Sequence, residues 1–327
     1  MDAILSRELD DARMSDEVSD ARQAAPCEVT HGIVTYLDVL GTRDVTSQKE
    51  AIEHARRIHG LHKFVDDQVG GFEGLIRAFF AILSNSPVLS AGNVAQFSDS
   101  MFLWVPVEPG KEFSALSDLA SILIRVFHHG LKSRLPLRGA ISIGPFVVDR
   151  GIFVGQAVTE AVEWERVGDW SGVILAPSAT TPVIRESGKP GGFERPAEFA
   201  WAKVPTKGSS VPSGMDLMVL AWPNVGLPTL RERLEEMYIS APLPVDIAVK
   251  WIHTMDFVDY IADQVEAGKI KSPNGAYQRL IRVIWEGEKS AGRGDDDSID
   301  AASGGPIERP STRPSSTSQG ATDSGKG

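Results

Sequence analysis

The chain has 327 residues, of which 42% are hydrophobic and 24% charged, a composition typical of a globular protein with room for about two domains. Its 44 acidic and 33 basic residues give a net charge of −11, which argues against a nucleic-acid binder. The single cysteine, Cys27, excludes an intrachain disulfide and a cysteine-rich zinc site. No apolar run approaches the ~20 residues of a membrane helix, and the acidic N-terminal segment lacks a signal-peptide pattern. We therefore expect a cytoplasmic protein with no membrane partner.

Composition divides the chain into four parts. Residues 1–28 form a polar N-terminal segment, and residues 289–327 are dominated by Ser, Gly, Pro, Thr and Asp, which predicts a disordered tail. Between these ends we expect a globular domain at 29–226 and a helical extension at 227–288.

The apolar pattern predicts alternating strands and helices along the chain. The first elements are a buried strand at 32–40, helices at about 42–67 and 72–84, and a hairpin at 93–107. A helix at 115–131, strands at 138–148 and 152–154, and a helix near 156–167 follow. The last are strands near 172–176, 198–204 and 216–222, then helices at about 229–239, 245–267 and 275–287. This order predicts an α+β sandwich, with helices on one face of a mixed sheet.

Several widespread catalytic signatures are absent from the sequence. It contains no Gly-x-x-x-x-Gly-Lys-Ser/Thr loop, no Gly-x-Gly-x-x-Gly, no Gly-x-Ser-x-Gly and no His-Glu-x-x-His. The candidate chemistry therefore has to come from residues without such a signature.

Two aspartates at predicted strand ends are the main candidates. Asp38 lies in an apolar strand, where an ionised carboxylate without a partner costs several kcal/mol, and a cation is the simplest remedy. Asp99 lies at the tip of the apolar hairpin, although an ordinary turn aspartate is the alternative. Two carboxylates on neighbouring strand ends would form a hard-oxygen site for Mg²⁺ or Mn²⁺. The loop after Asp38 leads into a predicted helix N-terminus, which favours phosphate oxygens.

Four blocks of sequence resemble the class III nucleotidyl cyclases, in the order that this family has them. They are Tyr-Leu-Asp-Val-Leu-Gly-Thr (36–42), Phe-Ser-Asp-Ser (97–100), Leu-Arg-Gly-Ala-Ile-Ser-Ile-Gly-Pro (137–145), and 155–168 with Val158, Ala161 and Glu165. The resemblance covers about residues 30–176. It implies a ferredoxin-like cyclase sandwich for the catalytic domain at 29–226. It also implies a homodimer with two sites at the interface.

At several positions this sequence lacks the residues that purine-specific class III cyclases carry, and these differences indicate which members of the family it resembles. The lysine position before the hairpin aspartate is Ala95, and the base-reading aspartate position is Ile152. The positions of the catalytic asparagine and arginine are Thr159 and Glu163. A site that cannot hydrogen-bond a purine edge loses its discrimination for purines. With these departures, the Phe-Ser-Asp-Ser hairpin and the long helical C-terminus, the chain resembles most the bacterial pyrimidine cyclases of antiphage signalling. These make cyclic UMP or cyclic CMP, second messengers of antiviral defence that a separate effector protein reads.

The resemblance assigns roles to particular residues. Asp38 and Asp99, with the Val39 carbonyl, would hold two divalent metal ions, Mn²⁺ or Mg²⁺. The substrate, UTP or CTP, would contact five residues, namely Tyr36, Leu40, Gly41, Thr42 and Arg138. A core tyrosine is the alternative for Tyr36, and a surface arginine is the alternative for Arg138.

Two rival functions stay open at this point. One is a purine (adenylate or guanylate) cyclase with altered base recognition. The other is a catalytically inactive cyclase-like module that binds a nucleotide or acts as a sensor. The pair Asp38 and Asp99 counts against the inactive module, whereas Thr159 and Glu163 count for it.

Overall fold

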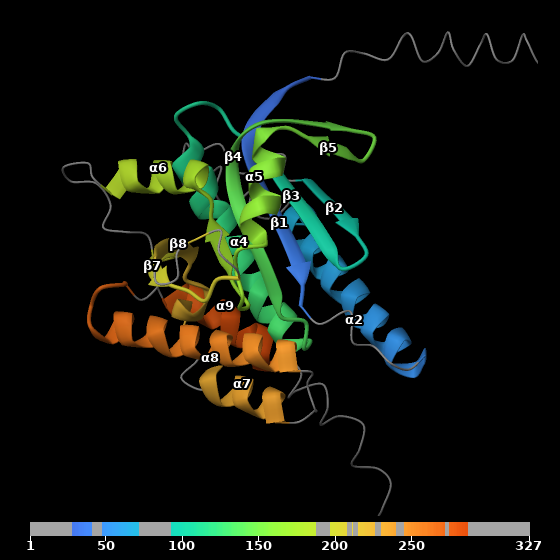
Figure 1. Cartoon of the computed structure of the whole chain (residues 1–327), viewed down its shortest axis with the longest axis vertical. Helices are drawn as coiled ribbons and strands as arrows, with labels where there is room; N and C mark the ends of the chain where they lie inside the picture. Colours follow the sequence, from blue (N-terminus) through green and yellow to red (C-terminus); the bar gives the residue numbers. More distant parts are fainter. Residues whose placement is uncertain are drawn as a thin grey trace, which may run out of the picture. The chain divides into compact units, whose positions relative to one another are not determined.

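Two interleaved strand–helix–strand units form the part of the sheet that carries the acidic residues (Figure 1). The computed structural model describes residues 28–40, 48–71, 93–187, 197–207, 211, 215–225, 230–239, 245–271 and 275–286. The first unit comprises β1 (Thr30–Val39), α2 (Gln48–Asp66) and β2 (Asn93–Phe97). The second comprises β3 (Ser100–Pro106), α4 (Glu112–Lys132) and β4 (Leu137–Asp149). These strands lie in the order β2-β3-β1-β4 with antiparallel neighbours, which is the predicted ferredoxin-like arrangement.

Three further strands extend this sheet beyond β4. β6 (Val173–Leu175) is parallel to β4, and β8 (Asp216–Leu220) and β7 (Phe199–Lys203) follow in antiparallel pairs. β5 (Ile152–Val154) pairs with the end of β4, and the two strands form an arm that leaves the sheet (Figure 1). The sheet is mixed and flanked by helices, so the predicted α+β class is confirmed.

The sheet buries a different set of side chains on each face. On β1, Ile33, Leu37 and Val39 point into the large core that α4 covers. The alternate residue Val34 packs instead in a small second cluster with Ala157 of α5 (Gln156–Glu165). The expectation that all helices lie on one face was therefore wrong. α5 lies along β4 on this second face, from Ala157 beside Ser142 to Glu165 beside Arg138. Tyr36 and Asp38 of β1 stay partly exposed on the same face, which we call the open face.

One helix was missed in the sequence. α6 (Pro177–Ser187) packs against α4 and β4 through the buried residues Ala179 and Val183. Its threonines and the interior Pro182 are weak helix formers, and tertiary burial outweighs that preference.

Some predicted elements lie partly or wholly outside the residues that the structure describes. α2 is described from Gln48 to Asp66 and continues into one π-helical turn at Asp67–Gly71, and the expected helix start near residue 42 lies outside the described residues. The helix expected at 72–84 lies outside the described residues, as do residues 1–27 and the tail at 289–327.

The C-terminal helices add to the large core. They are α7 (Leu230–Ile239), α8 (Val245–Glu266) and α9 (Gly275–Glu286), which follow a short 3-10 helix at Trp222–Val225. Trp251 and Trp285 are buried in the same cluster as the residues of α4. No helix in the described segments is long and apolar enough to cross a bilayer.

The fully buried His128 links α9 to α4 and to the 3-10 helix at Trp222–Val225 through hydrogen bonds. The Trp285 indole N–H donates to Nδ1 of His128 at 3.0 Å, so the other ring nitrogen carries the proton. That nitrogen, Nε2, lies 3.1 Å from the Trp222 carbonyl oxygen. Burial lowers the pKa of His128 to about 4, and the bond to the carbonyl opposes this shift only in part. His128 is therefore neutral in the folded protein at neutral pH.

This pKa predicts an acid-sensitive fold. The unfolded chain takes up a proton at His128 near pH 6.5, while the folded protein resists protonation down to about pH 4. The stabilising contribution is thus complete above pH 6.5 and falls by about 3 kcal/mol by pH 4. Urea unfolding of wild type and His128→Gln between pH 4 and 8 measures the difference. Equal pH dependence of the two proteins would contradict the buried neutral histidine.

Candidate active site

A chain of polar contacts crosses three strands on the open face of the sheet. The Tyr36 hydroxyl donates to Ser100 Oγ at 3.1 Å, and Ser100 Oγ donates to Asp38 Oδ1 at 3.1 Å. On the other side of Asp38, Nη2 of Arg138 donates to Oδ2 at 3.1 Å. Strand register causes these contacts, because Asp38 is directly opposite Ser100 on β3 and Arg138 on β4. The structure therefore places Arg138 in contact with Asp38, on the face of β1 that the sequence predicts Tyr36 and Asp38 to share.

The chain of contacts ends on a second carboxylate, at the C-terminal end of α5. Nε of Arg138 lies 2.5 Å from Glu165 Oε1. Only 11% of the Arg138 side chain and 4% of the Glu165 side chain are exposed. Arg138 is therefore not a surface arginine. It is a buried cation shared between Asp38 and Glu165.

The sequence analysis did not assign Ser100 and Glu165 to the site. A signal for Glu165 was present, because it follows Val158 and Ala161 on the buried stripe of α5. An acidic residue on such a stripe requires a buried cationic partner. For Ser100 the signal was weaker, since a serine next to a turn is common.

Burial and neighbouring charges shift the titration of two of these groups. Burial raises the pKa of Glu165, the Arg138 guanidinium opposes that shift, and the Asp38 carboxylate adds to it. The pKa of Tyr36 is also raised, mainly by burial, with added contributions from Asp38, Glu165 and Asp99. The site thus concentrates negative charge around a single arginine.

Asp99 lies in the turn between β2 and β3, beside the end of β1. Ser98, with a φ of 56°, closes this turn, and the Asp99 carbonyl accepts a hydrogen bond from the Val39 N–H at 3.0 Å. The charge of Asp99 raises the pKa of both Tyr36 and His54 of α2, although burial lowers the pKa of His54 overall. The two predicted acidic segments are therefore neighbours, even though they are distant in the sequence.

The remaining predicted site residues follow Asp38. Val39 has a buried side chain, and the N–H of Leu40 donates to the Pro136 carbonyl at 2.8 Å. These contacts fix the end of β1 against its neighbours. Gly41 and Thr42, expected to contact the substrate, lie outside the described residues.

The residues present fit a divalent cation in their chemistry. Asp38 and Asp99 offer carboxylate oxygens, and Ser100 adds a hydroxyl oxygen beside Asp38. Within the described ranges no group of three or more His, Cys, Asp or Glu residues is placed to hold a metal. Two carboxylates suit Mg²⁺, which commonly takes one or two from the protein and completes its shell with water and substrate phosphates. In this structure Arg138 occupies the position of the counter-cation on Asp38.

An aromatic surface continues from Tyr36 along the open face. Phe102 lies 4.7 Å from Tyr36 between ring centroids and stacks on Phe153 of the arm at 5.1 Å. Trp104 meets the same Phe153 ring edge to face at 5.0 Å, and Phe97 meets it at 5.9 Å. Alternate positions of β3 and the arm thus build an apolar wall beside the acidic residues.

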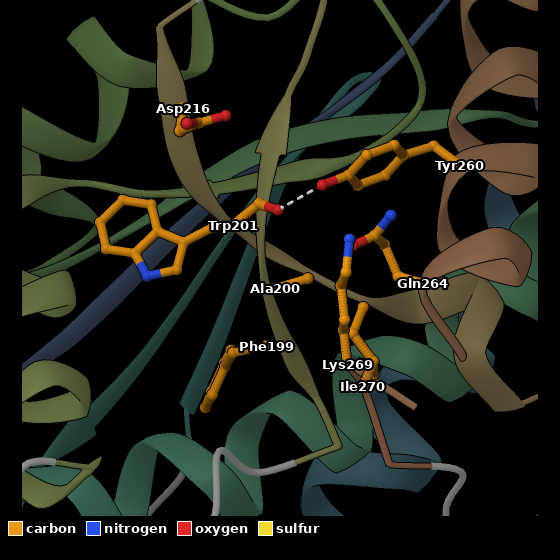
Figure 2. A pocket seen from close by; sticks show the side chains of 8 residues that line it. All are labelled: Phe199, Ala200, Trp201, Asp216, Tyr260, Gln264, Lys269 and Ile270. Atoms are coloured by element: carbon orange, nitrogen blue, oxygen red, sulfur yellow. Dashed lines mark hydrogen bonds between the residues drawn. The ribbon is translucent and has the colours of Figure 1, made fainter. Parts of the chain in front are cut away.

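Two cavities have volumes of about 400 Å³ each, and neither Asp38 nor Asp99 is among the described residues that line them. One is beside the C-terminal end of α5, and Trp164, Arg166 and Lys207 are among the residues that line it. Lys207 is close enough to Arg138 and Glu165 for both to influence its pKa, which burial lowers. The other cavity lies between β7 and α8, where Figure 2 shows the Tyr260 hydroxyl donating to the Trp201 carbonyl, at 2.9 Å. The described residues that line this second cavity include the carboxylate of Asp216 and the ammonium group of Lys269.

The solved structures with folds similar to this chain include nucleotidyl cyclases, and both their sequence identities and their TM-scores are low. The catalytic core of a rhodopsin-guanylyl cyclase with converted specificity, in complex with ATPαS, is 10% identical and has a TM-score of 0.39. The match covers 60% of this chain and 98% of that one. The guanylyl cyclase Cya2 is 10% identical, with a TM-score of 0.32 and coverage of 59% and 92%. A class III adenylyl cyclase-like ATP-binding protein from Pseudomonas aeruginosa is 12% identical, with a TM-score of 0.30 and coverage of 74% and 44%.

No protein-family profile and no curated protein matches the chain. At TM-scores below 0.5 the structural similarities do not establish a family, so the function has to be argued from the residues of the site.

The shared arginine predicts a pH-dependent loss of stability when it is removed. In Arg138→Met, Glu165 and Asp38 lose their common cation, and we expect unfolding to become easier by about 3 kcal/mol at pH 8. Without Arg138 the pKa of Glu165 rises further, so the folded protein keeps a proton that the unfolded chain releases above pH 4.5. The loss should therefore be smaller at pH 5 than at pH 8, as urea unfolding measures. The double variant Arg138→Met/Glu165→Gln should recover part of it, and no recovery would contradict the shared pair.

Proposed function

We propose that the protein is a metal-dependent nucleotidyl cyclase with Asp38 and Asp99 at its catalytic centre. The observation that supports this most is the meeting of two acid-bearing segments at one end of the sheet, where the Asp99 carbonyl binds the Val39 N–H next to Asp38. A carboxylate at a strand end, beside a second acid and a buried arginine, suits the binding of a cation and a polyphosphate. A purely structural ion pair between Asp38 and Arg138 would not require Asp99 beside it.

The proposed reaction is an intramolecular phosphoryl transfer. The ribose 3′-hydroxyl of a nucleoside triphosphate gives its proton to solvent water, and its oxygen bonds to the α-phosphorus. The bond from that phosphorus to the oxygen bridging to the β-phosphate breaks, and diphosphate leaves. Bound Mn²⁺ or Mg²⁺ would lower the pKa of the 3′-hydroxyl and neutralise phosphate charge. Asp38 and Asp99 would hold the ions, and Arg138 would place a fixed positive charge near the phosphates. Arg166 and Lys207, at the neighbouring cavity, offer further positive charge.

The proposed substrate is a pyrimidine nucleotide, UTP or CTP, as the resemblance of the sequence implies. Ala95 and Ile152 stand where purine-specific cyclases carry a lysine and a base-reading aspartate, and neither offers a polar group to a purine edge. The Tyr36 hydroxyl is engaged with Ser100, so its proposed role is to stack on the base with its ring. The same resemblance extends the proposal to antiviral signalling, in which a separate effector protein reads cyclic UMP or cyclic CMP.

The direct test is product formation from each nucleotide. Purified protein is incubated with Mn²⁺ and UTP, CTP, ATP or GTP separately, and products are resolved by mass spectrometry. We expect a 3′,5′-cyclic pyrimidine nucleotide, and a rate at least about 100-fold lower in Asp38→Ala and in Asp99→Ala.

A product from ATP or GTP alone would contradict the pyrimidine assignment and support a purine cyclase. Absence of any product, with or without phage extract, would contradict the enzyme and support the inactive module.

We further propose that the active form is a homodimer, with the arm as part of its interface. The arm residues Ile152 and Val154 are 63% and 52% exposed, and Phe97, which contacts the arm through Phe153, is 45% exposed. Exposed apolar side chains that gather next to a site are typical of a surface that a partner covers. A second copy of the chain would bury them and close the open face.

Substitution on the arm tests this dimer. Ile152→Arg introduces a charge into the proposed contact, and we expect a monomer with little cyclase activity, because each site would need both subunits. Sedimentation velocity and the product assay measure the two effects. Ile239→Arg, at a residue of α7 that is 79% exposed, serves as the matched control and should change neither. A fully active monomeric Ile152→Arg protein would contradict the shared site.

A further inference from the structure

One cation serves two carboxylates at the candidate site. Arg138 contacts Asp38 through Nη2 and Glu165 through Nε, so its charge is divided between them. Glu165 is 4% exposed, whereas Asp38 is 24% exposed. Water cannot solvate the buried Glu165 carboxylate, whereas the more accessible Asp38 carboxylate can bind an ion from solution.

A divalent ion at Asp38 would compete with this arrangement. It would bring two positive charges next to the Arg138 guanidinium, which already occupies Oδ2 of Asp38. Like charges at this separation repel each other strongly in a partly buried site. Arg138 therefore has to release Asp38 when an ion binds, and the ease of that release depends on what else holds the arginine.

We propose that Glu165 is a positioning residue that retains Arg138 when a divalent cation replaces it on Asp38. The inference rests on the proposed function, because it requires a cation at Asp38. Glu165 keeps the guanidinium at the site but off the metal-binding carboxylate. Without Glu165, Asp38 is the only carboxylate that contacts Arg138 among the described residues, and the arginine becomes a stronger competitor of the metal.

Two features of the structure support this role. Glu165 belongs to the last turn of α5, and that helix is fixed on the sheet because Ser142 Oγ donates to its Ala157 carbonyl at 2.5 Å. Nη2 of Arg138, which now contacts Asp38, lies on the same side of the guanidinium as Nε, which contacts Glu165. When Arg138 leaves Asp38, Nη2 is therefore free to form a second contact with Glu165 beside Nε.

The test is Mn²⁺ affinity without nucleotide, measured by electron paramagnetic resonance titration. Binding to Asp38→Asn is subtracted, so that only Asp38-dependent binding is compared. We expect Glu165→Gln to weaken Mn²⁺ binding about tenfold, the order found for residues that orient a metal ligand. Glu165→Asp should restore much of the affinity. Arg138→Met should bind Mn²⁺ at least as tightly as wild type, and adding Glu165→Gln to it should change nothing further.

A control separates positioning from a general loss of structure. Glu160 is on the same helix and accepts the Ser178 N–H at 3.2 Å, so Glu160→Gln perturbs α5 without touching Arg138. It should leave Mn²⁺ affinity unchanged, and thermal unfolding verifies that every variant is folded. Equal affinity of Glu165→Gln and wild type would overturn the proposal, as would an equal loss in the Arg138→Met background. If Asp38→Asn itself binds Mn²⁺ like wild type, the metal site and the proposed function fail together.

Discussion

The pairing of Arg138 with both Asp38 and Glu165 is the constraint on which the open face depends. It joins β1, β4 and the end of α5 through one guanidinium, next to a Glu165 carboxylate that is almost fully buried. The position of Glu165 is in turn fixed by α5, which packs on the second face of the sheet. The ion pairs of the site therefore depend on the packing of α5, because a shift of this helix would remove Glu165 from Arg138 and leave Asp38 as its single partner.

Local apolar patterns explain how much of the fold the sequence could predict. β1 was predicted from its β-rich apolar run and α4 from an apolar stripe that repeats about every 3.6 residues, both with nearly correct bounds. α6 has no such signal, since its threonines and Pro182 argue against a helix until burial is known. Periodicity also fails to tell which face of the sheet a helix covers. The apolar stripe of α5 predicts a helix but does not distinguish the large core from the small cluster around Val34.

The site was predictable where it depends on alternation and unpredictable where it depends on pairing between distant elements. Tyr36 and Asp38 share a face because they are two residues apart, and the sequence predicts this directly. It also predicts that Asp38 needs a cation, but it does not predict that Arg138 supplies one, because the register of β1 against β4 is a tertiary property. Asp99 is harder still. A turn with a positive φ at Ser98 breaks the alternation, so strand periodicity does not predict the face to which the next side chain belongs.

An acid at the end of a buried strand has two ways to be neutralised, by an internal arginine or by a divalent ion from solution. The structure shows the first, and the proposed chemistry requires the second. The two states differ by an exchange of counter-charge at Asp38, so the preference between them is a small difference between large electrostatic free energies. A nucleoside triphosphate brings several negative charges and can carry the ion with it, which favours the exchange and gives the released arginine a phosphate to face. The same residues would therefore accept either counter-charge at Asp38, and Glu165 sets how far apart in free energy these two states lie.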